Sequence, residues 1–166
     1  YRRSFLQDQG VGLASARAGN VIGGGDWADD RLIPDILRSF EKNESVIIRN
    51  PKATRPWQHV LEPLSGYLIL AQKLYENQGN YSEGWNFGPN EKDVKPVDWI
   101  LNNMIAKWPN SSWELDQNSN PHEAGFLKLD ISKAESRLDW KSVWELRQTL
   151  EKIIAWHRAW IDKKDM

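Results

Sequence analysis

The chain has 166 residues, enough for one domain with a sizeable core, and a formal net charge of −1 without a basic block. This balance gives no support for a nucleic-acid partner or a membrane surface, and no apolar run in the sequence is long enough to cross a bilayer. The absence of cysteine excludes disulfides, thiolate nucleophiles and cysteine-ligated zinc, and it fits the cytoplasmic location that we expect.

The first quarter of the chain predicts a helix end, a buried strand, a glycine loop and a second helix. Residues 1–9 have helical character and stop at Gly10, a residue type that often ends helices. The apolar run 11–17 predicts a strand buried on both faces, as in the middle of a parallel sheet. Residues 32–40 predict a helix with Pro34 in its first turn, where proline is tolerated.

The rest of the chain alternates between strand and helix patterns. We expect strands or extended segments at 45–49, 55–60, 84–87 and 126–130, an irregular segment at 110–125, and helices at 63–75, 96–108, 132–138 and 144–161. This alternation predicts the α/β class. No segment of the sequence is an obvious neighbour for the strand at 11–17, so we expect its partners to lie upstream of Tyr1.

The glycine loop after the first strand has the pattern of a dinucleotide fingerprint. Residues 23–28 (GGGDWA) fit it, but a dinucleotide site also needs a second strand that ends in an acid about 20 residues on. That position holds the tail of a predicted helix, residues 39–44. We therefore interpret the glycines as a loop that borders a ligand site, with a structural turn as the alternative. A strand end, a loop and a helix start together suit an anionic ligand.

The ten tryptophans are unusual for a chain of this length, and most should lie in the core or at an interface. Trp27 and Trp57 lie inside polar loop motifs, which makes them candidates for a pocket wall.

Several long motifs resemble the CDP-glucose 4,6-dehydratase family. They are residues 17–27 (RAGNVIGGGDW), 30–35 (DRLIPD), 49–63 (RNPKATRPWQHVLEP), 85–89 (WNFGP), 121–124 (PHEA) and 129–134 (LDISKA). They occur in order along essentially the whole chain. The family belongs to the extended short-chain dehydrogenase/reductases that modify nucleotide sugars, and the resemblance implies an NAD-dependent lyase of polysaccharide biosynthesis.

The resemblance also implies how the chain is organised. Residues 1–44 correspond to the end of a Rossmann-like NAD(P)-binding domain, and residues 45–166 to a nucleotide-sugar-binding domain with a small mixed sheet and a returning segment near 57–90. The family's NAD fingerprint and catalytic Tyr-x-x-x-Lys fall upstream of Tyr1. We therefore expect no catalytic residue in this chain, NAD held mostly by the missing N-terminal half, no turnover by the chain alone, and a homo-oligomer.

The resemblance implies a specific set of site residues. The substrate-binding candidates are Asn20, Arg31, Leu32, Ile48, Arg49, Arg55, His122 and Glu123, and the cofactor-binding candidates are Ala18, Asn20 and Val21.

Each candidate has an expected role. Asn20, Arg31 and Arg55 would contact the diphosphate, since a guanidinium offers paired donors to phosphate oxygens. Leu32 and Ile48 would flank the base, although related dehydratases often have an aromatic residue in place of Ile48. Arg49 would read the edge of the cytosine.

The remaining candidates lie in a loop that closes over the nucleotide sugar in the family. His122 and Glu123 belong to this loop, but Asn120 or Pro121 stands where thymidine-nucleotide dehydratases have an arginine. For Asn20 the alternative is an asparagine that caps its own turn, and for Arg31 and Arg55 it is an ordinary surface ion pair.

His59 and His157 are expected to be packed, structural side chains, and the histidine spacing predicts no metal site.

Two other functions remain open from the sequence. One is a different nucleotide-sugar epimerase, dehydratase or reductase, and base identity distinguishes it. The other is a non-catalytic nucleotide-sugar-binding or assembly module, whose tryptophans serve an interface.

Overall fold

The computed structural model describes residues 2–118 and 125–163, and it confirms the α/β class. The strands are β1 (Ser15–Ala18), β2 (Asn20–Ile22), β3 (Val46–Ile48), β4 (Thr54–His59), β5 (Gly84–Phe87), β6 (Val94–Pro96) and β7 (Trp113–Leu115). The α-helices are α1 (Leu32–Lys42), α2 (Leu61–Glu76), α3 (Gln78–Tyr81), α4 (Val97–Ile105), α5 (Ser132–Leu138) and α6 (Leu146–Ile161). In the described ranges, no helix is both long and apolar enough to cross a membrane.

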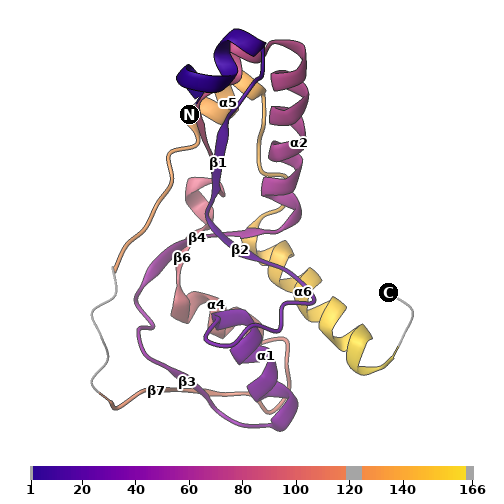
Figure 1. Ribbon diagram of the computed structural model, residues 1–166. Coiled ribbons are helices and arrows are strands. Elements are labelled where there is room, and N and C mark those ends of the chain that lie inside the picture. Colours follow the sequence, from indigo (N-terminus) through magenta and orange to yellow (C-terminus); the bar gives the residue numbers. More distant parts are fainter. Residues whose placement is uncertain (1, 119–124, 164–166) are drawn as a thin grey trace.

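The strands form small sheets that join distant parts of the sequence. β1 pairs with β5, β2 with β4, and β3 with β7, each in parallel, and β6 adds to β4 in antiparallel orientation. Figure 1 shows an elongated chain in which β2 and β4 cross the middle. Above them lie β1, α2, α3, β5 and α5, which we call the upper region. Below them lie α1, β3, α4, β7 and α6, which together with β2, β4 and β6 we call the lower region.

Each region has its own hydrophobic core. The upper core consists of the buried residues Leu70, Trp85, Phe87, Ala134, Leu138 and Trp140. The lower core consists of the buried residues Ile22, Ile33, Ile36, Leu37, Phe40, Val46, Ile48, Ala53, Trp57, Val97, Ile100, Leu101, Met104, Leu146, Leu150, Ile153 and Ile154. The lower core joins α1 to α4 and α6, which both follow residue 45. The assignment of residues 1–44 and 45–166 to two domains stays a prediction.

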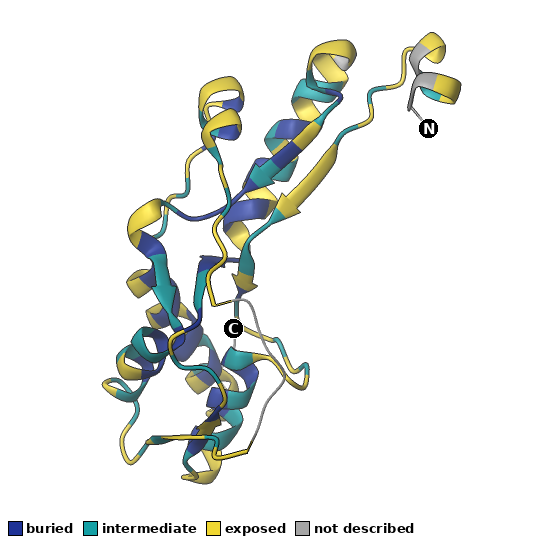
Figure 2. Cartoon of the chain, turned by 90° about the vertical axis from the view of Figure 1, so that its left-hand side faces the viewer, coloured by how far each residue is buried: buried dark blue, intermediate teal, exposed yellow. Residues whose placement is uncertain are grey.

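The prediction for the first strand was wrong in two respects. β1 begins only at Ser15, and its first three residues are exposed, as Figure 2 shows in yellow along this strand. It also has a neighbour within the chain, because Ser15 to Ala18 pair with Gly84 to Phe87. The partner lies about 70 residues downstream, and a local hydrophobic pattern contains no information on such a pairing.

Two short elements also differ from the sequence-based prediction. The expected strand at 126–130 is absent from the described residues, where Phe126 forms only an isolated bridge with Thr54. Conversely, β7 forms inside the segment 110–125 that we expected to be irregular. Strands of three residues carry too little periodicity to be recognised before their partners are known.

The upper region is built by close approach of α2 to β5. A Cβ added at Gly66 would lie 2.3 Å from Cδ1 of Phe87, so glycine lets the helix reach the strand. Tyr67 and Trp140 pack edge-to-face on the Phe87 ring. The opposite face of α2 exposes Leu64, Leu68 and Tyr75.

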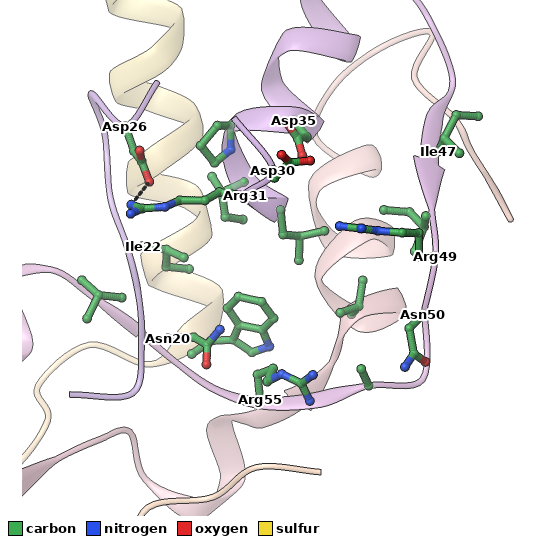
Figure 3. Close-up of a pocket in the computed structure, with 18 residues that line it drawn as sticks. Asn20, Ile22, Asp26, Asp30, Arg31, Asp35, Ile47, Arg49, Asn50 and Arg55 are labelled. Carbon is green, nitrogen blue, oxygen red and sulfur yellow. Dashed lines mark hydrogen bonds and ion pairs between the residues drawn. The ribbon is translucent and has the colours of Figure 1, made fainter. Parts of the chain in front are cut away.

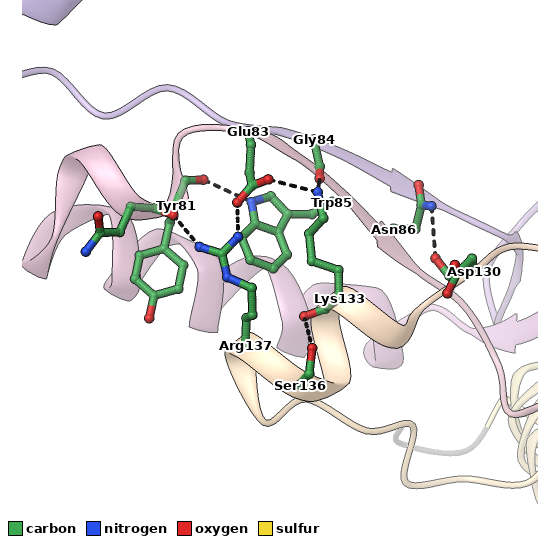
Figure 4. A network of polar contacts seen from close by, with 10 residues as sticks. Tyr81, Glu83, Gly84, Trp85, Asn86, Asp130, Lys133, Ser136 and Arg137 are labelled. Atoms are coloured by element: carbon green, nitrogen blue, oxygen red, sulfur yellow. Dashed lines mark hydrogen bonds and ion pairs between the residues drawn. The ribbon is translucent and has the colours of Figure 1, made fainter.

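Polar contacts fix α5 beside β5 (Figure 4). Glu83 accepts hydrogen bonds from Lys133 at 2.9 Å and from Arg137, and both cations also lie over the Trp85 ring. The hydrogen bond from Lys133 is the main reason why the pKa of Glu83 is lowered. Because these groups are partly exposed, we expect a modest contribution to stability.

A buried carboxylate joins the two regions. Glu62, in the first turn of α2, accepts hydrogen bonds from the backbone N–H groups of Val143 at 2.8 Å and Trp144 at 2.9 Å. The next residue, Glu145, forms a capping box with Gln148 at the start of α6. The start of α2 thereby fixes the start of α6.

Candidate functional site

A cavity of about 520 Å³ opens in the lower region, within the size range of small-molecule sites (Figure 3). It lies between the end of β2, the start of α1, the end of β3 and the strand β4. The lining residues are Asn20, Val21, Ile22, Asp26, Asp30, Arg31, Leu32, Ile33, Pro34, Asp35, Ile47, Ile48, Arg49, Asn50, Ala53, Arg55, Trp57 and Val97.

The fold brings most of the sequence-predicted site residues to this cavity. The predicted residues that line it are Asn20, Val21, Arg31, Leu32, Ile48, Arg49 and Arg55. Ala18 lies outside the lining and pairs with Phe87 at the end of β1. His122 and Glu123 lie outside the described residues. The ligand roles of all these residues stay predictions.

The parallel pairing of β2 with β4 sets the floor of the cavity. Asn20 lies opposite Trp57, and the indole N–H of Trp57 donates a hydrogen bond to the carbonyl oxygen of Lys95 at 2.9 Å. This bond fixes a buried aromatic ring, so Trp57 is a rigid wall, as its position in a polar motif suggested. Arg55, two residues earlier, donates from Nη1 to the carbonyl oxygen of Thr54 at 3.0 Å.

The start of α1 forms the opposite wall. Arg31 has the extended backbone of an N-cap residue, and its Nη1 lies 3.2 Å from Oδ2 of Asp26. The ion pair that we considered as the alternative for Arg31 is therefore present. The positive end of the α1 dipole points toward the cavity, which favours an anion there.

Charges of both signs line the cavity. The arginines 31, 49 and 55 and the aspartates 26, 30 and 35 all line it, and Figure 3 shows Arg31 against Asp26. Asp35 forms an ion pair with Arg38, and Asp26 with Arg31. An anionic ligand is thus met by cations, of which Arg31 already has a carboxylate partner.

The glycine loop packs on α6. A Cβ at Gly24 would lie 2.4 Å from Cδ2 of Trp156, and the Trp27 ring lies 4.5 Å from the Trp160 ring, centroid to centroid. Trp27 is absent from the cavity lining, so its predicted place in a pocket wall was wrong. The space into which a side chain at position 24 would point is filled by the Trp156 indole.

Two histidines are packed side chains, as the sequence predicted. Nδ1 of His59 accepts a hydrogen bond from the Leu61 N–H at 3.2 Å, and its ring packs on Trp144. Burial lowers the pKa of His59, because it disfavours the charged imidazolium. His157 is buried and lies 2.6 Å from Oε1 of Glu41. Among the described residues, no group of three or more histidine, aspartate or glutamate side chains is arranged to hold a metal.

Sequence reasoning missed Asp26, Asp30 and Val97 as cavity residues. Val97 begins α4, far along the chain from the glycine loop, and no sequence signal places it there. Asp26 carried a signal, because it follows three glycines directly beside the predicted ligand site.

The sequence was compared with protein-family models and with curated proteins. No protein-family model matches the sequence. The chain is 58% identical over its whole length to CDP-glucose 4,6-dehydratase of Salmonella typhimurium and covers 48% of that protein. The chain thus spans about half the length of this curated relative, and the match is to its C-terminal half.

Solved structures agree on the fold at low sequence identity. A UDP-glucose 4-epimerase from Stenotrophomonas maltophila, with bound NAD and formylated UDP-arabinopyranose, superimposes with a TM-score of 0.79 at 16% identity over 95% of this chain and 51% of its own. The dTDP-glucose 4,6-dehydratase of Bacillus anthracis, in complex with NAD, gives 0.72 at 14% identity over 99% and 49%. The chain therefore has the fold of part of an extended short-chain dehydrogenase/reductase, and its sequence resembles the C-terminal half of CDP-glucose 4,6-dehydratase.

Proposed function

We propose that the chain is the nucleotide-sugar-binding part of a CDP-glucose 4,6-dehydratase, and that the cavity holds the CDP portion of the substrate. The observation that carries the proposal is the convergence of Asn20, Arg31, Ile48, Arg49 and Arg55 on one cavity, from segments that are distant in the sequence. These residues offer cations and an amide for a diphosphate, and an apolar side chain for a base.

Each side chain has a distinct role in this proposal. Arg55 and Arg31 bind the diphosphate oxygens, because a guanidinium donates paired hydrogen bonds to phosphate. Asn20 donates its amide to the same group. Ile48 and Leu32 pack on the cytosine, and Arg49 contacts the edge of the base.

The reaction of the family converts CDP-glucose to CDP-4-keto-6-deoxyglucose and water. NAD, when bound, would supply the hydride-transfer chemistry of this reaction. Ala18, Asn20 and Val21, at the junction of β1 and β2, would border its nicotinamide, whereas the glycine loop would not hold its phosphates. This chain's part is to hold the nucleotide in a fixed place, so that the sugar is presented to catalytic groups elsewhere.

Other expectations from the sequence also stay proposals. They are the assignment of residues 1–44 to the Rossmann-like domain and residues 45–166 to the nucleotide-sugar domain, a homo-oligomer, and a cytoplasmic location.

The direct test is a calorimetric titration of CDP, UDP and dTDP into the purified chain, after circular dichroism has shown that the chain is folded. We expect CDP to bind most tightly. A preference for UDP or dTDP would favour a different nucleotide-sugar enzyme. The absence of binding by a folded chain would favour an assembly module.

Turnover is tested in a chimera. Residues 1–166 would replace the matching half of the Salmonella typhimurium dehydratase, to which they are 58% identical. We expect the chimera to form the 4-keto product from CDP-glucose and NAD, and the chain alone to form none. Turnover by the chain alone, or an inactive but folded chimera that binds CDP, would contradict the proposed division of labour.

A further inference from the structure

Arg31 differs from Arg49, which also lines the cavity. Figure 3 shows the Arg49 guanidinium reaching into the cavity, whereas Arg31 extends to Asp26 on the side of the glycine loop. Nη1 of Arg31 lies 3.2 Å from Oδ2 of Asp26, and the Arg31 side chain is 65% exposed. A long and exposed side chain can change its partner at little cost.

Asp26, by contrast, is held in place. Its Oδ1 accepts a hydrogen bond from the Ala28 N–H at 3.1 Å, which fixes the carboxylate in its own turn. On one side, Gly24 lies against Trp156, and on the other, Trp27 packs on Trp160. The loop is thereby anchored to α6 before and after Asp26. The position of Arg31 in the pair is therefore set by Asp26, and not the reverse.

We propose that Asp26 is a positioning residue that controls nucleotide affinity by competing with the diphosphate for Arg31. This inference rests on the proposed function. The Asp26 carboxylate holds the guanidinium at the cavity edge, and a bound diphosphate recruits Arg31 only by exchanging one anion for another.

The expected effect of the competition is small and has a definite sign. Exposed ion pairs stabilise weakly, and their loss corresponds to a factor of about two to five in affinity. Removing the Asp26 carboxylate should therefore strengthen diphosphate binding by about two- to fivefold. If the Asp26 carboxylate instead held Arg31 in position to bind the diphosphate, its removal would weaken diphosphate binding.

Asp26→Asn is the central variant. Its amide oxygen can still accept the hydrogen bond from Ala28, so the turn is kept while the charge is lost. Asp29→Asn is the matched control, because Asp29 lies in the same loop, is 93% exposed and pairs with Arg38 at 3.4 Å, outside the cavity lining. Both variants change the net charge equally. A general electrostatic effect would therefore appear in both.

The dissociation constants for CDP and for inorganic pyrophosphate are measured by calorimetry in wild type and variants. We expect tighter binding in Asp26→Asn, unchanged binding in Asp29→Asn, and no gain from Asp26→Asn in an Arg31→Ala background. Weaker binding in Asp26→Asn, an equal effect in Asp29→Asn, or a gain that persists without Arg31 would overturn the inference.

Two further measurements keep the outcomes distinct. If CDP binds no better than UDP or dTDP but pyrophosphate shows the predicted pattern, the proposed base specificity fails and the role of Asp26 stands. If neither CDP nor pyrophosphate binds, both fail. Independently of any Asp26 variant, Arg31→Ala should weaken CDP binding by less than the roughly tenfold loss expected for a charged hydrogen bond that has no competing carboxylate. A loss of about tenfold or more would overturn the inference even if Asp26→Asn did not fold.

Discussion

The upper and lower regions differ in how completely they are packed. In the lower region α1, α4 and α6 surround a continuous core, and residues such as Ile36, Ile100 and Leu150 are fully buried. In the upper region, the β1–β5 pair is covered by α2 and α5, while β1 stays largely exposed and Leu68 and Tyr75 of α2 are 74% and 88% exposed.

The region that contains the cavity is therefore not the region whose parallel strands are left partly uncovered. Parallel strands are normally buried on both faces, and the upper region provides only part of such a cover. The lower region completes its own core and contains the whole lining of the cavity. We therefore expect substitutions in the upper region to change stability, and those in the lower region to change stability and nucleotide affinity together.

The largest expected effect is on stability in the upper region. Phe87→Ala removes a fully buried ring between Tyr67 and Trp140, and should lower the free energy of unfolding by about 3–5 kcal/mol, measured by urea denaturation. Phe126→Ala, at a 65% exposed ring, is the matched control and should cost little. The folded fraction of Phe87→Ala should still bind CDP, and loss of binding by folded protein would show that the regions are not separable.

The next effect is on affinity and compares an arginine from each region. Arg55→Ala should weaken CDP binding by about 1.5–3 kcal/mol, or roughly 10- to 150-fold, because it removes charged hydrogen bonds to phosphate. Arg137→Ala, on the surface of the upper region, should leave the dissociation constant unchanged. Equal losses would indicate a general effect of net charge. Unchanged binding in Arg55→Ala would contradict the diphosphate role.

A smaller effect tests the contact between the glycine loop and α6. Gly24→Ala would place a methyl group against Trp156 and should cost about 1–3 kcal/mol of stability through overpacking, with a change in CDP affinity since the loop bears Asp26. Gly79→Ala, where an added Cβ meets nothing within 4 Å, is the control in the upper region. Thermal and urea unfolding measure both variants. A stable Gly24→Ala with unchanged affinity would show that the contact does not position the loop.

The smallest expected effect concerns pH. The pKa of His59 is lowered by burial, so the folded chain binds this proton less tightly than the unfolded chain. Its neutral form therefore stabilises the fold above about pH 6.5, the ordinary value, and this contribution is lost as the pH falls through the lowered pKa.

The measurement is the free energy of unfolding between neutral pH and about pH 5. We expect His59→Gln to be less sensitive to pH over this window than the wild type. An unchanged pH dependence would assign the effect to other groups.

The helices could be predicted because their signals are local. The expected helices at 32–40, 63–75, 96–108 and 144–161 match α1, α2, α4 and α6 within a few residues. Apolar spacing and capping residues mark such elements without reference to the rest of the fold. The strand pairings could not be predicted, since Ser15 meets Gly84 and Val46 meets Trp113, each nearly 70 residues away.

The residues of the candidate site could be predicted where they belong to a motif shared with a known family. Asn20, Arg31 and Arg55 came from motif resemblance, and all three line the cavity. The close approach of Gly24 to Trp156 joins residues more than 130 positions apart, and only the three-dimensional structure shows it. For the same reason Trp27 was expected at the cavity and lies instead on α6.

The packing of Trp27 on α6 also gives the protein an intrinsic optical probe. The Trp27 ring lies 4.5 Å from that of Trp160 and 6.3 Å from that of Trp156, close enough for the excited states of the indoles to couple. Coupled indoles give circular dichroism bands whose shape depends on their mutual orientation. A movement of the loop that bears Asp26 would therefore change the spectrum of the unlabelled protein, and Trp27→Phe would identify the bands that report it.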